Sequence, residues 1–257
     1  MAFEDTYITR VKGLIEDPQK GIKKIIPFIR SRINPYYRKL LESLHIYSLV
    51  KPYSNHEELL QFVNFKNGFF VQCGGNDGYS NDPTYYLEKV LGWEGLIVEP
   101  LPIYRLCKQN RPNSVVYNCA VGSFDNLNKT TSFVDCNAMS FVAGSINNDK
   151  EWIEAGEKAQ KIKAKLVTVP IKPIQALIDD YFVINKPRSI DLFVADTEGY
   201  EFSILQGLDF TKNSPTYILL EIHKDSELEI IKDYLSIRGY EVIKAMKQRD
   251  FLFKLQK

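Results

Sequence analysis

Hydrophobic residues after Gly68 come in short runs that end in turn-forming residues, and helix-length stretches separate these runs. Such a pattern is typical of a parallel sheet whose strands are joined by crossover helices. Two later apolar runs, 240–245 and 250–255, are close enough in sequence to form an antiparallel hairpin. We therefore predict a doubly wound α/β domain, with a mostly parallel seven-stranded sheet that ends in this hairpin. Its other strands are expected at 69–73, 95–99, 115–120, 190–196 and 217–223.

The start of the chain has a different pattern, with apolar residues at helical spacing and basic residues between them. Residues 1–51 carry ten Lys or Arg against five Asp or Glu, which leaves 23 against 27, a formal net charge of −4, for the remainder. We expect a basic helical extension over residues 1–53 and one domain over residues 54–257. The extension either packs on the core with its basic face in water, or makes peripheral contact with an anionic membrane.

Two local patterns refine the domain. Ser54 followed by Glu57 has the spacing of a capping box, so a helix is predicted to begin with Ser54 as its N-cap. Residues 124–169 are long and polar enough to be an insertion, with short strands expected at 131–134 and 166–169.

Composition excludes several classes of protein. A formal net charge of +1 lacks the positive field expected of a nucleic-acid-binding protein. No apolar run approaches the ~18 residues of a transmembrane segment, and acids stand where a signal peptide needs positive charge. The four cysteines show no metal-binding spacing, which favours reduced thiols in a cytoplasmic protein.

A glycine-rich loop follows the first predicted strand and contains Gly74, Gly75 and Gly78. Glycines there let the backbone approach a ligand closely. Cys73 stands where a dinucleotide fingerprint needs its first glycine, which weakens the alternative of a nicotinamide-dependent oxidoreductase. The loop suits a smaller, cationic ligand, bound by Gly74, Gly75, Asn76, Asp77 and Gly78, with Asp77 near an ammonium group. Glycines that serve only the turn geometry are the other interpretation.

Further ligand contacts are expected at the ends of the next two predicted strands. Glu99 closes an apolar strand at the carboxyl edge of the sheet, where a carboxylate can accept both hydroxyls of a ribose. A helix cap or a surface position is the alternative for Glu99. The third strand brings Asn118 and Ala120 towards an adenine ring.

Five segments together resemble the FkbM family of S-adenosylmethionine-dependent methyltransferases: FVQCGGNDGYSN, GWEGLIVEPLP, NRP, IDLFVADTEGYEFSILQGLDF and ILLEIH. The resemblance covers residues 68–223 and implies a class I, Rossmann-like methyltransferase fold. It also implies S-adenosylmethionine bound by residues 74–78 and Glu99, and methyl transfer to a hydroxyl of a sugar, glycan or secondary metabolite. The sequence departs from the family at Gln72, usually an acid, and at Gly75, usually alanine. Gln72 keeps open a catalytically inactive cofactor-binding module, unless Asp77 or Asp196 replaces the missing acid.

Polar residues at the fourth and fifth strand ends carry the expected chemistry. A hydroxyl is a poor nucleophile at neutral pH and needs a base or a metal ion. We expect His223 to be the base and Asp196 and Glu198 to complete the catalytic set. Asp196, Glu221 and His223 are the candidate ligands if Mg²⁺ or Mn²⁺ takes part.

Two expectations concern the surroundings of this site. The alternative for Asp196 and Glu198 is that they only cap a helix over 200–206 that Gly207 terminates. The small-molecule or glycan acceptor is expected to meet the loop at 135–152, where Met139, Ser140 and Phe141 would cover the cofactor.

Overall fold

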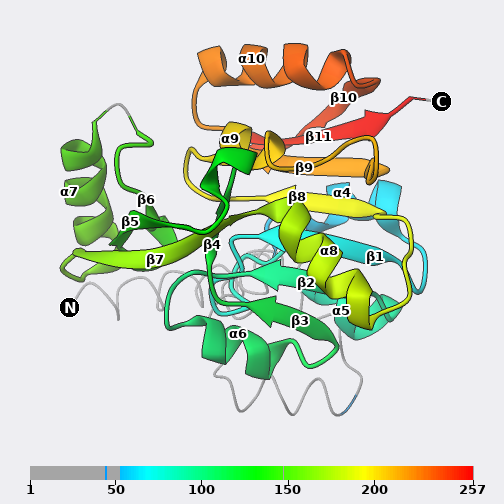
Figure 1. Ribbon diagram of the computed structural model, residues 1–257, viewed down its shortest axis with the longest axis horizontal. Helices are drawn as coiled ribbons and strands as arrows, with labels where there is room; N and C mark the ends of the chain where they lie inside the picture. Colours follow the sequence, from blue (N-terminus) through cyan, green and yellow to red (C-terminus); the bar gives the residue numbers. More distant parts are fainter. Residues whose placement is uncertain (1–43, 45–52, 147, 257) are drawn as a thin grey trace, which may run out of the picture.

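The structure is a computed structural model that describes Leu44, residues 53–146 and residues 148–256 (Figure 1). The predicted basic extension over residues 1–53 therefore lies outside the described residues, except for Leu44 and Tyr53. No helix in the described part of the chain combines the length and the hydrophobicity that crossing a membrane requires. Cys73, Cys107, Cys119 and Cys136 are free and buried.

The main sheet has seven strands in the order β10-β11-β9-β8-β1-β2-β3. The five strands from β9 to β3 are parallel, whereas β11 is antiparallel to both β9 and β10. This arrangement confirms the predicted doubly wound sheet with a terminal hairpin. The strands are β1 (Phe69–Cys73), β2 (Glu94–Val98), β3 (Ser114–Tyr117), β8 (Leu192–Ala195), β9 (Tyr217–Glu221), β10 (Tyr240–Ala245) and β11 (Asp250–Leu255).

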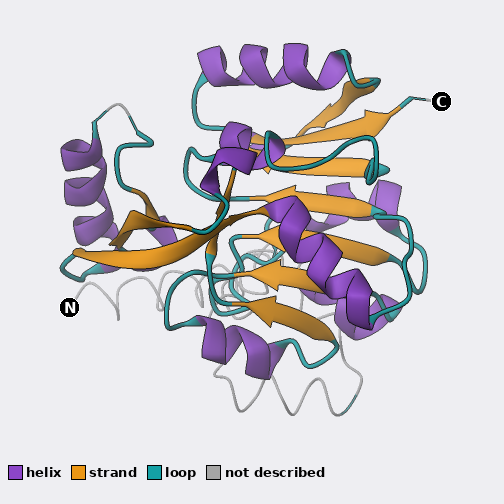
Figure 2. Ribbon diagram, in the orientation of Figure 1, coloured by secondary structure: helices purple, strands orange, loops and turns teal. Residues whose placement is uncertain are grey.

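Helices cover both faces of this sheet (Figure 2). Alternate residues of β1 belong to two hydrophobic clusters: Phe69, Val71 and Cys73 pack with α8, α9 and α10, and Phe70 packs with α4, α5 and α6. Successive side chains of β1 point to opposite faces of the sheet, and both faces are covered. The strand is therefore completely buried, as expected for a central parallel strand. The helices are α4 (His56–Val63), α5 (Tyr85–Leu91), α6 (Tyr104–Asn110), α8 (Ile174–Ile184), α9 (Glu201–Leu205) and α10 (Asp225–Ser236).

A second sheet of four strands, in the order β4-β7-β5-β6, lies beside the carboxyl ends of the parallel strands (Figure 1). Its two long strands, β5 (Lys129–Asp135) and β7 (Lys165–Pro173), contain both strands predicted within the insertion. The other elements of this region are β4 (Ala120–Gly122), β6 (Phe141–Val142), helix α7 (Asp149–Gln160) and the 3₁₀ helices Phe124–Asn126 and Asn137–Met139, while a third 3₁₀ helix, Lys247–Arg249, joins β10 to β11.

The single strand predicted over 115–120 was wrong. The chain leaves the main sheet after Tyr117 and enters the small sheet at Ala120, where β4 pairs with β7. Between them, the side-chain amide of Asn118 donates to the carbonyls of Glu99 and Pro100, at 3.0 and 2.8 Å. The bend therefore depends on a contact with a segment about 20 residues earlier, which an apolar run cannot reveal.

The predicted capping box at Ser54 was also wrong. Helix α4 begins at His56, and its N-cap residue is Asn55, whose side chain makes no capping hydrogen bond. The Asn55 amide instead donates to Asp250 Oδ2 at 2.6 Å and to the Lys247 carbonyl at 2.7 Å. The Asn55 side chain thus makes tertiary hydrogen bonds to Lys247 and Asp250 instead of a capping hydrogen bond at the start of α4.

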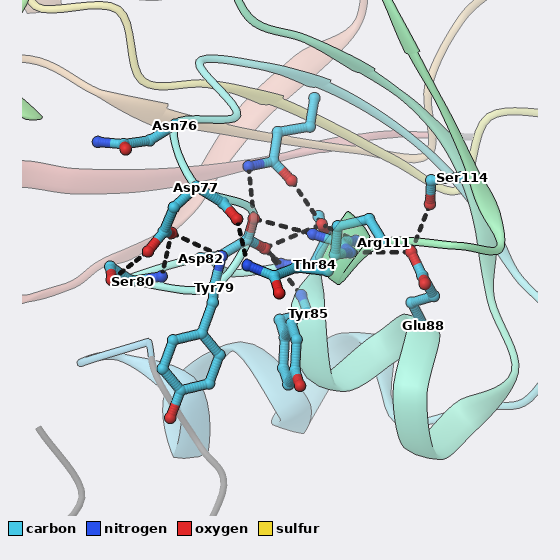
Figure 3. Close-up of polar contacts among 12 residues, drawn as sticks. Asn76, Asp77, Tyr79, Ser80, Asp82, Thr84, Tyr85, Glu88, Arg111 and Ser114 are labelled. Atoms are coloured by element: carbon cyan, nitrogen blue, oxygen red, sulfur yellow. Dashed lines mark hydrogen bonds and ion pairs between the residues drawn. The ribbon is translucent and has the colours of Figure 1, made fainter. Parts of the chain in front are cut away.

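Arg111, at the end of α6, is fully buried and holds the loop that follows β1 (Figure 3). Its guanidinium donates to Asp82 Oδ2 and Glu88 Oε2, both at 2.8 Å, and to Thr84 Oγ1 at 2.7 Å. Both carboxylates are almost completely buried. Because a buried carboxylate needs a paired charge, Arg111 makes this arrangement of loop and helix possible.

Gln72 joins the same network from the sheet, because it lies on the same face of β1 as Phe70. Its amide donates to Asp82 Oδ2 at 3.1 Å and to the Gly74 carbonyl at 3.3 Å, and its oxygen accepts from Thr84 Oγ1 at 2.5 Å. A carboxylate at position 72 would place a like charge against Asp82 and could not donate to it. The network therefore explains a glutamine here: the amide complements Asp82.

Replacing Arg111 with Met should destabilise the fold by about 3–5 kcal/mol, because Asp82 and Glu88 would remain buried without a partner. Lys108→Met, an exposed change on the same helix, is the matched control and should change the stability by less than about 0.5 kcal/mol. Urea unfolding followed by circular dichroism measures both. Equal unfolding midpoints for the two variants would contradict the assigned role of Arg111.

Candidate functional site

A cavity of about 540 Å³ opens between the carboxyl ends of the parallel strands and the small sheet. One end is lined by the loop after β1 and by the end of β2, and the other by the ends of β8 and β9 together with β5 and the Asn137–Met139 turn. Its volume is typical of small-molecule sites. The cavity therefore lies where open α/β sheets bind their ligands, at the carboxyl ends of their strands.

The glycine loop meets this cavity through Gly74, Gly75 and Asn76. Gly74 has φ +88°, and an added Cβ would lie 1.9 Å from the carbonyl oxygen of Asp196. At Gly75 an added Cβ would lie 2.4 Å from Ile97 Cγ2. The packing of Ile97 thus gives a reason for glycine where the family usually has alanine, and the loop presents bare backbone to the cavity.

Glu99 lies at the centre of the cavity wall and is 6% exposed. Its two carboxylate oxygens accept backbone N–H groups, from Asn76 at 2.7 Å and from Leu101 at 2.9 Å. Burial raises the pKa of Glu99 to about 7, although these two hydrogen bonds oppose the shift. Because each carboxylate oxygen has a second lone pair, Glu99 can still accept two hydroxyls of a ligand.

Three residues predicted to bind a cofactor do not line the cavity: Asp77, Gly78 and Asn118. Asp77 Oδ1 accepts the backbone N–H groups of Tyr79 and Ser80, and its Oδ2 accepts the Ser80 hydroxyl (Figure 3). Asp77 therefore stabilises its own turn. Ala120, by contrast, does line the cavity.

Carboxyl groups gather at the other end of the cavity, where the structure brings Asp196, Glu198 and Glu221 together. Glu221 and Asp196 are hydrogen-bonded through their side chains, and burial together with the charge of Asp196 raises the pKa of Glu221 far above its usual range. Glu221 therefore holds its proton more tightly than an exposed carboxyl group does. The strand ends thus converge as the sequence predicted.

Glu198 reaches the cavity from a turn with unusual backbone geometry. Its φ is +58° and that of Gly199 is +97°, and the left-handed region is unfavourable for a glutamate. Behind Glu198 lies His223, whose Nε2 is 2.9 Å from Glu198 Oε2. Trp152 of α7 packs edge-on against the imidazole with ring centroids 5.3 Å apart. His223 itself does not line the cavity, so Glu198 is the member of the pair that a ligand would meet.

The Glu198–His223 contact shifts the proton affinity of both groups. Burial raises the pKa of Glu198, although the hydrogen bond from His223 opposes this shift. The hydrogen bond to Glu198 is the main reason why the pKa of His223 is raised, and burial opposes it. Each member of the pair therefore binds a proton more tightly than it would as an exposed side chain.

The alternative in which Asp196 and Glu198 only cap a helix was wrong. Helix α9 has no side-chain cap, and Glu201 holds the preceding turn instead. Glu201 is fully buried, and its Oε1 accepts from the backbone N–H and the hydroxyl of Thr197, both at 2.8 Å. Gly207 follows the end of α9 for a different reason: an added Cβ would lie 1.9 Å from the Gly122 carbonyl oxygen.

Among the described residues, the group that could hold a metal ion consists of Glu198, Glu221 and His223, whose donor atoms lie within 4.8 Å of one another. The third residue of this group is Glu198 and not Asp196, which was expected from the sequence. Carboxylate and imidazole ligands suit Mn²⁺ better than Mg²⁺, which prefers oxygen ligands alone. The Glu198–His223 hydrogen bond also satisfies these residues without an ion.

Sequence reasoning missed several residues of the cavity wall. Asp82, Thr197 and Tyr200 all contribute to it, although Thr197 and Tyr200 lie within a segment that resembles the FkbM family. The expected lid was partly right, since Met139 and Ser140 line the cavity. Phe141 is instead fully buried beside Val134 and Cys136.

Solved structures show likenesses of low identity. A SAM-dependent methyltransferase from Aquifex aeolicus is 13% identical, with 92% of this chain and 95% of that chain covered and a TM-score of 0.39. Precorrin-6y C5,15-methyltransferase from Geobacter metallireducens is 8% identical, with 77% and 85% covered and a TM-score of 0.38. TrmK from M. capricolum, in complex with S-adenosyl-homocysteine, is 9% identical, with 77% and 66% covered and a TM-score of 0.37. No curated protein matches the sequence.

The family comparison gives a more specific result. The sequence matches the family described as Methyltransferase FkbM domain over residues 72–242. This range includes the glycine loop, Glu99 and both acidic strand ends, which are the parts that meet in the cavity. The seven-stranded sheet has the doubly wound arrangement that the resemblance implied, and the chain belongs to the methyltransferase FkbM domain family.

Proposed function

We propose that this protein transfers the methyl group of S-adenosylmethionine to a hydroxyl group of a sugar, glycan or secondary metabolite. One observation carries the proposal: a single cavity joins the glycine loop and Glu99 to the carboxyl groups of Asp196, Glu198 and Glu221. A methyl donor held at the first end would face proton-accepting groups at the second. The nicotinamide alternative loses its basis, since the family is one of methyltransferases.

The donor set at the first end of the cavity fits S-adenosylmethionine. Glu99 would accept the two ribose hydroxyls, and the bare backbone of Gly74 and Gly75 admits the ligand closely. Ala120 and its neighbour Cys119 form an apolar wall for the adenine. Asp196, next to Gly74, is the carboxyl group in place to hold the ammonium group. Gln72 is satisfied within the Arg111 network, so its departure from the family pattern is not by itself evidence for an inactive module.

Glu198 would accept the proton of the acceptor hydroxyl. When bound, S-adenosylmethionine supplies a methyl group already activated by its positive sulfur. The protein must therefore position the acceptor oxygen and remove its proton. Glu198 lines the cavity and has a raised pKa, which makes its carboxylate a stronger base than an exposed one. His223 would be a positioning residue that orients Glu198 through their 2.9 Å contact, a role different from the base expected from the sequence.

Three points beyond this site stay predictions: a cytoplasmic location, the absence of a nucleic-acid substrate, and a membrane contact of the basic N-terminal segment.

Glu99→Gln should weaken binding of S-adenosylhomocysteine by about 1–3 kcal/mol, because the amide offers one acceptor oxygen in place of two. Affinity of the unchanged protein should also fall as the pH drops below about 7, the pKa of Glu99. The sign follows because the ligand binds the ionised carboxylate, so binding below this pKa must first release a proton. The decline should approach about tenfold per pH unit.

Isothermal titration calorimetry between pH 6 and pH 8 measures both effects. Glu94→Gln, an exposed change at the other end of β2, is the matched control. Identical pH profiles for Glu99→Gln and the unchanged protein would contradict the assignment of Glu99.

Glu198→Gln should lower kcat by roughly 10²–10⁴-fold, the usual contribution of a general base, and should leave S-adenosylhomocysteine affinity nearly unchanged. His223→Gln should lower kcat less, because Glu198 remains. The rate of S-adenosylhomocysteine formation measures these effects, with exposed Glu229→Gln on α10 as the control. A larger loss for His223→Gln than for Glu198→Gln would reverse the two roles.

Removal of divalent cations separates this mechanism from a metal-assisted one. After dialysis against EDTA, turnover should persist, because the proposed base needs no ion. If turnover is instead lost and returns with Mn²⁺ or Mg²⁺, then Glu198, Glu221 and His223 act as metal ligands and the base assignment is wrong.

A further inference from the structure

The wall of the cavity carries charge of only one sign. Among the described residues that line it, none is Lys, Arg or His. Six of them carry carboxyl groups: Asp82, Glu99, Asp135, Asp196, Glu198 and Glu221. An acidic wall without basic residues discriminates between ligands by their charge.

Three of these carboxyl groups belong to the part of the cavity proposed for the cofactor, where Asp196 would hold the ammonium group. Asp82 is paired with the guanidinium of Arg111 at 2.8 Å. Glu99 accepts two backbone N–H groups. The charge around an acceptor therefore depends on the remaining three: Asp135, Glu198 and Glu221.

Among the described residues, no basic side chain lines the cavity beside these three groups, although His223 contacts Glu198 from behind the wall. Asp135 lies at the end of β5 in the small sheet, close enough to Glu99 to raise the pKa of that carboxyl group. The carboxyl groups of the wall therefore come from both the main sheet and the small sheet.

A phosphate or carboxylate group would meet only repulsion at this end. Proteins bind such groups with Arg, Lys or clusters of backbone N–H groups, and the described wall offers no basic side chain there. A neutral polyol or an amine encounters no such barrier. The apolar side chains of Phe133, Val142 and Tyr200 also line the cavity and suit the C–H faces of a sugar ring.

From this juxtaposition we propose that the acceptor is a hydroxyl compound, neutral or amine-bearing, that carries no phosphate or carboxylate group. The inference rests on the proposed methyl transfer and narrows its substrate class. It separates glycosides and amino sugars from nucleotide sugars, sugar phosphates and nucleic acids. Asp135 is then a specificity-determining residue, because it adds a carboxyl group to the cavity wall from the small sheet.

The test uses the full chain and S-adenosylmethionine with a deuterated methyl group. A small-molecule extract of the source organism is first divided by anion exchange into an unretained fraction, which is neutral and cationic, and a retained, anionic fraction. Mass spectrometry then measures the label in each. We expect at least about tenfold more labelled product in the unretained fraction, the scale set by one unscreened charge contact near a protein surface. A majority of label in the retained fraction would overturn the inference while leaving methyl transfer intact.

Label in neither fraction, from protein that still binds S-adenosylhomocysteine, would overturn the transfer itself and this inference with it. The failure of the two proposals is therefore distinguishable.

Asp135→Lys tests the residue directly and should raise the retained-to-unretained ratio of label by about tenfold. Asp125→Lys, an exposed change outside the cavity wall, is the matched control and should leave the ratio unchanged. If Asp135→Lys does not fold, Asp135→Asn should shift the ratio in the same direction by a smaller factor. An unchanged ratio in the folded variant would show that this acidic wall does not select the acceptor.

Discussion

The buried guanidinium of Arg111 is the interaction on which the ligand loop depends. It compensates two carboxylates that lie almost entirely out of water, Asp82 and Glu88, and so ties α5 and α6 to the segment after β1. Through Asp82 it also fixes the Gln72 amide, which in turn holds the Gly74 carbonyl. A binding loop made of glycines has little rigidity of its own, so a charged network behind it supplies the order that its backbone lacks.

The small sheet turns an ordinary strand-end crevice into an enclosed site. In an open α/β sheet, the carboxyl ends of β1, β2, β8 and β9 would face solvent. Here β5, β6 and the Asn137–Met139 turn stand opposite them and complete the cavity wall. The small sheet also packs directly against the segment after α9, because Gly207 lies against the carbonyl oxygen of Gly122 in β4. The insertion thus belongs to the site.

The chemistry of the site follows from a surplus of carboxyl groups with few cations. Burial and mutual repulsion raise the pKa values of Glu99, Glu198 and Glu221 together. Such groups hold protons that exposed carboxylates would have lost, and they favour positive ligands over negative ones. The same excess of carboxyl groups underlies the three roles proposed for the site: binding a sulfonium cofactor, accepting a proton and selecting the acceptor.

The sequence by itself determined the sheet and most of the cofactor end. Short apolar runs that end in turn-forming residues predicted β1, β10 and β11 at their observed bounds, because burial of a strand depends mainly on local composition. Glycines and an acid at consecutive strand ends must meet in a parallel sheet, so Gly74, Gly75 and Glu99 could be placed before any coordinates.

The tertiary structure decided which polar groups face the ligand. Asp77 and Glu198 look alike in the sequence, each an acid beside a glycine, yet Asp77 closes its own turn and Glu198 faces the cavity. Likewise, the break after Tyr117 and the start of α4 depend on the side-chain contacts of Asn118 and Asn55 with distant segments. Hydrogen bonds of this kind join residues far apart in the chain, and only the folded arrangement fixes their partners.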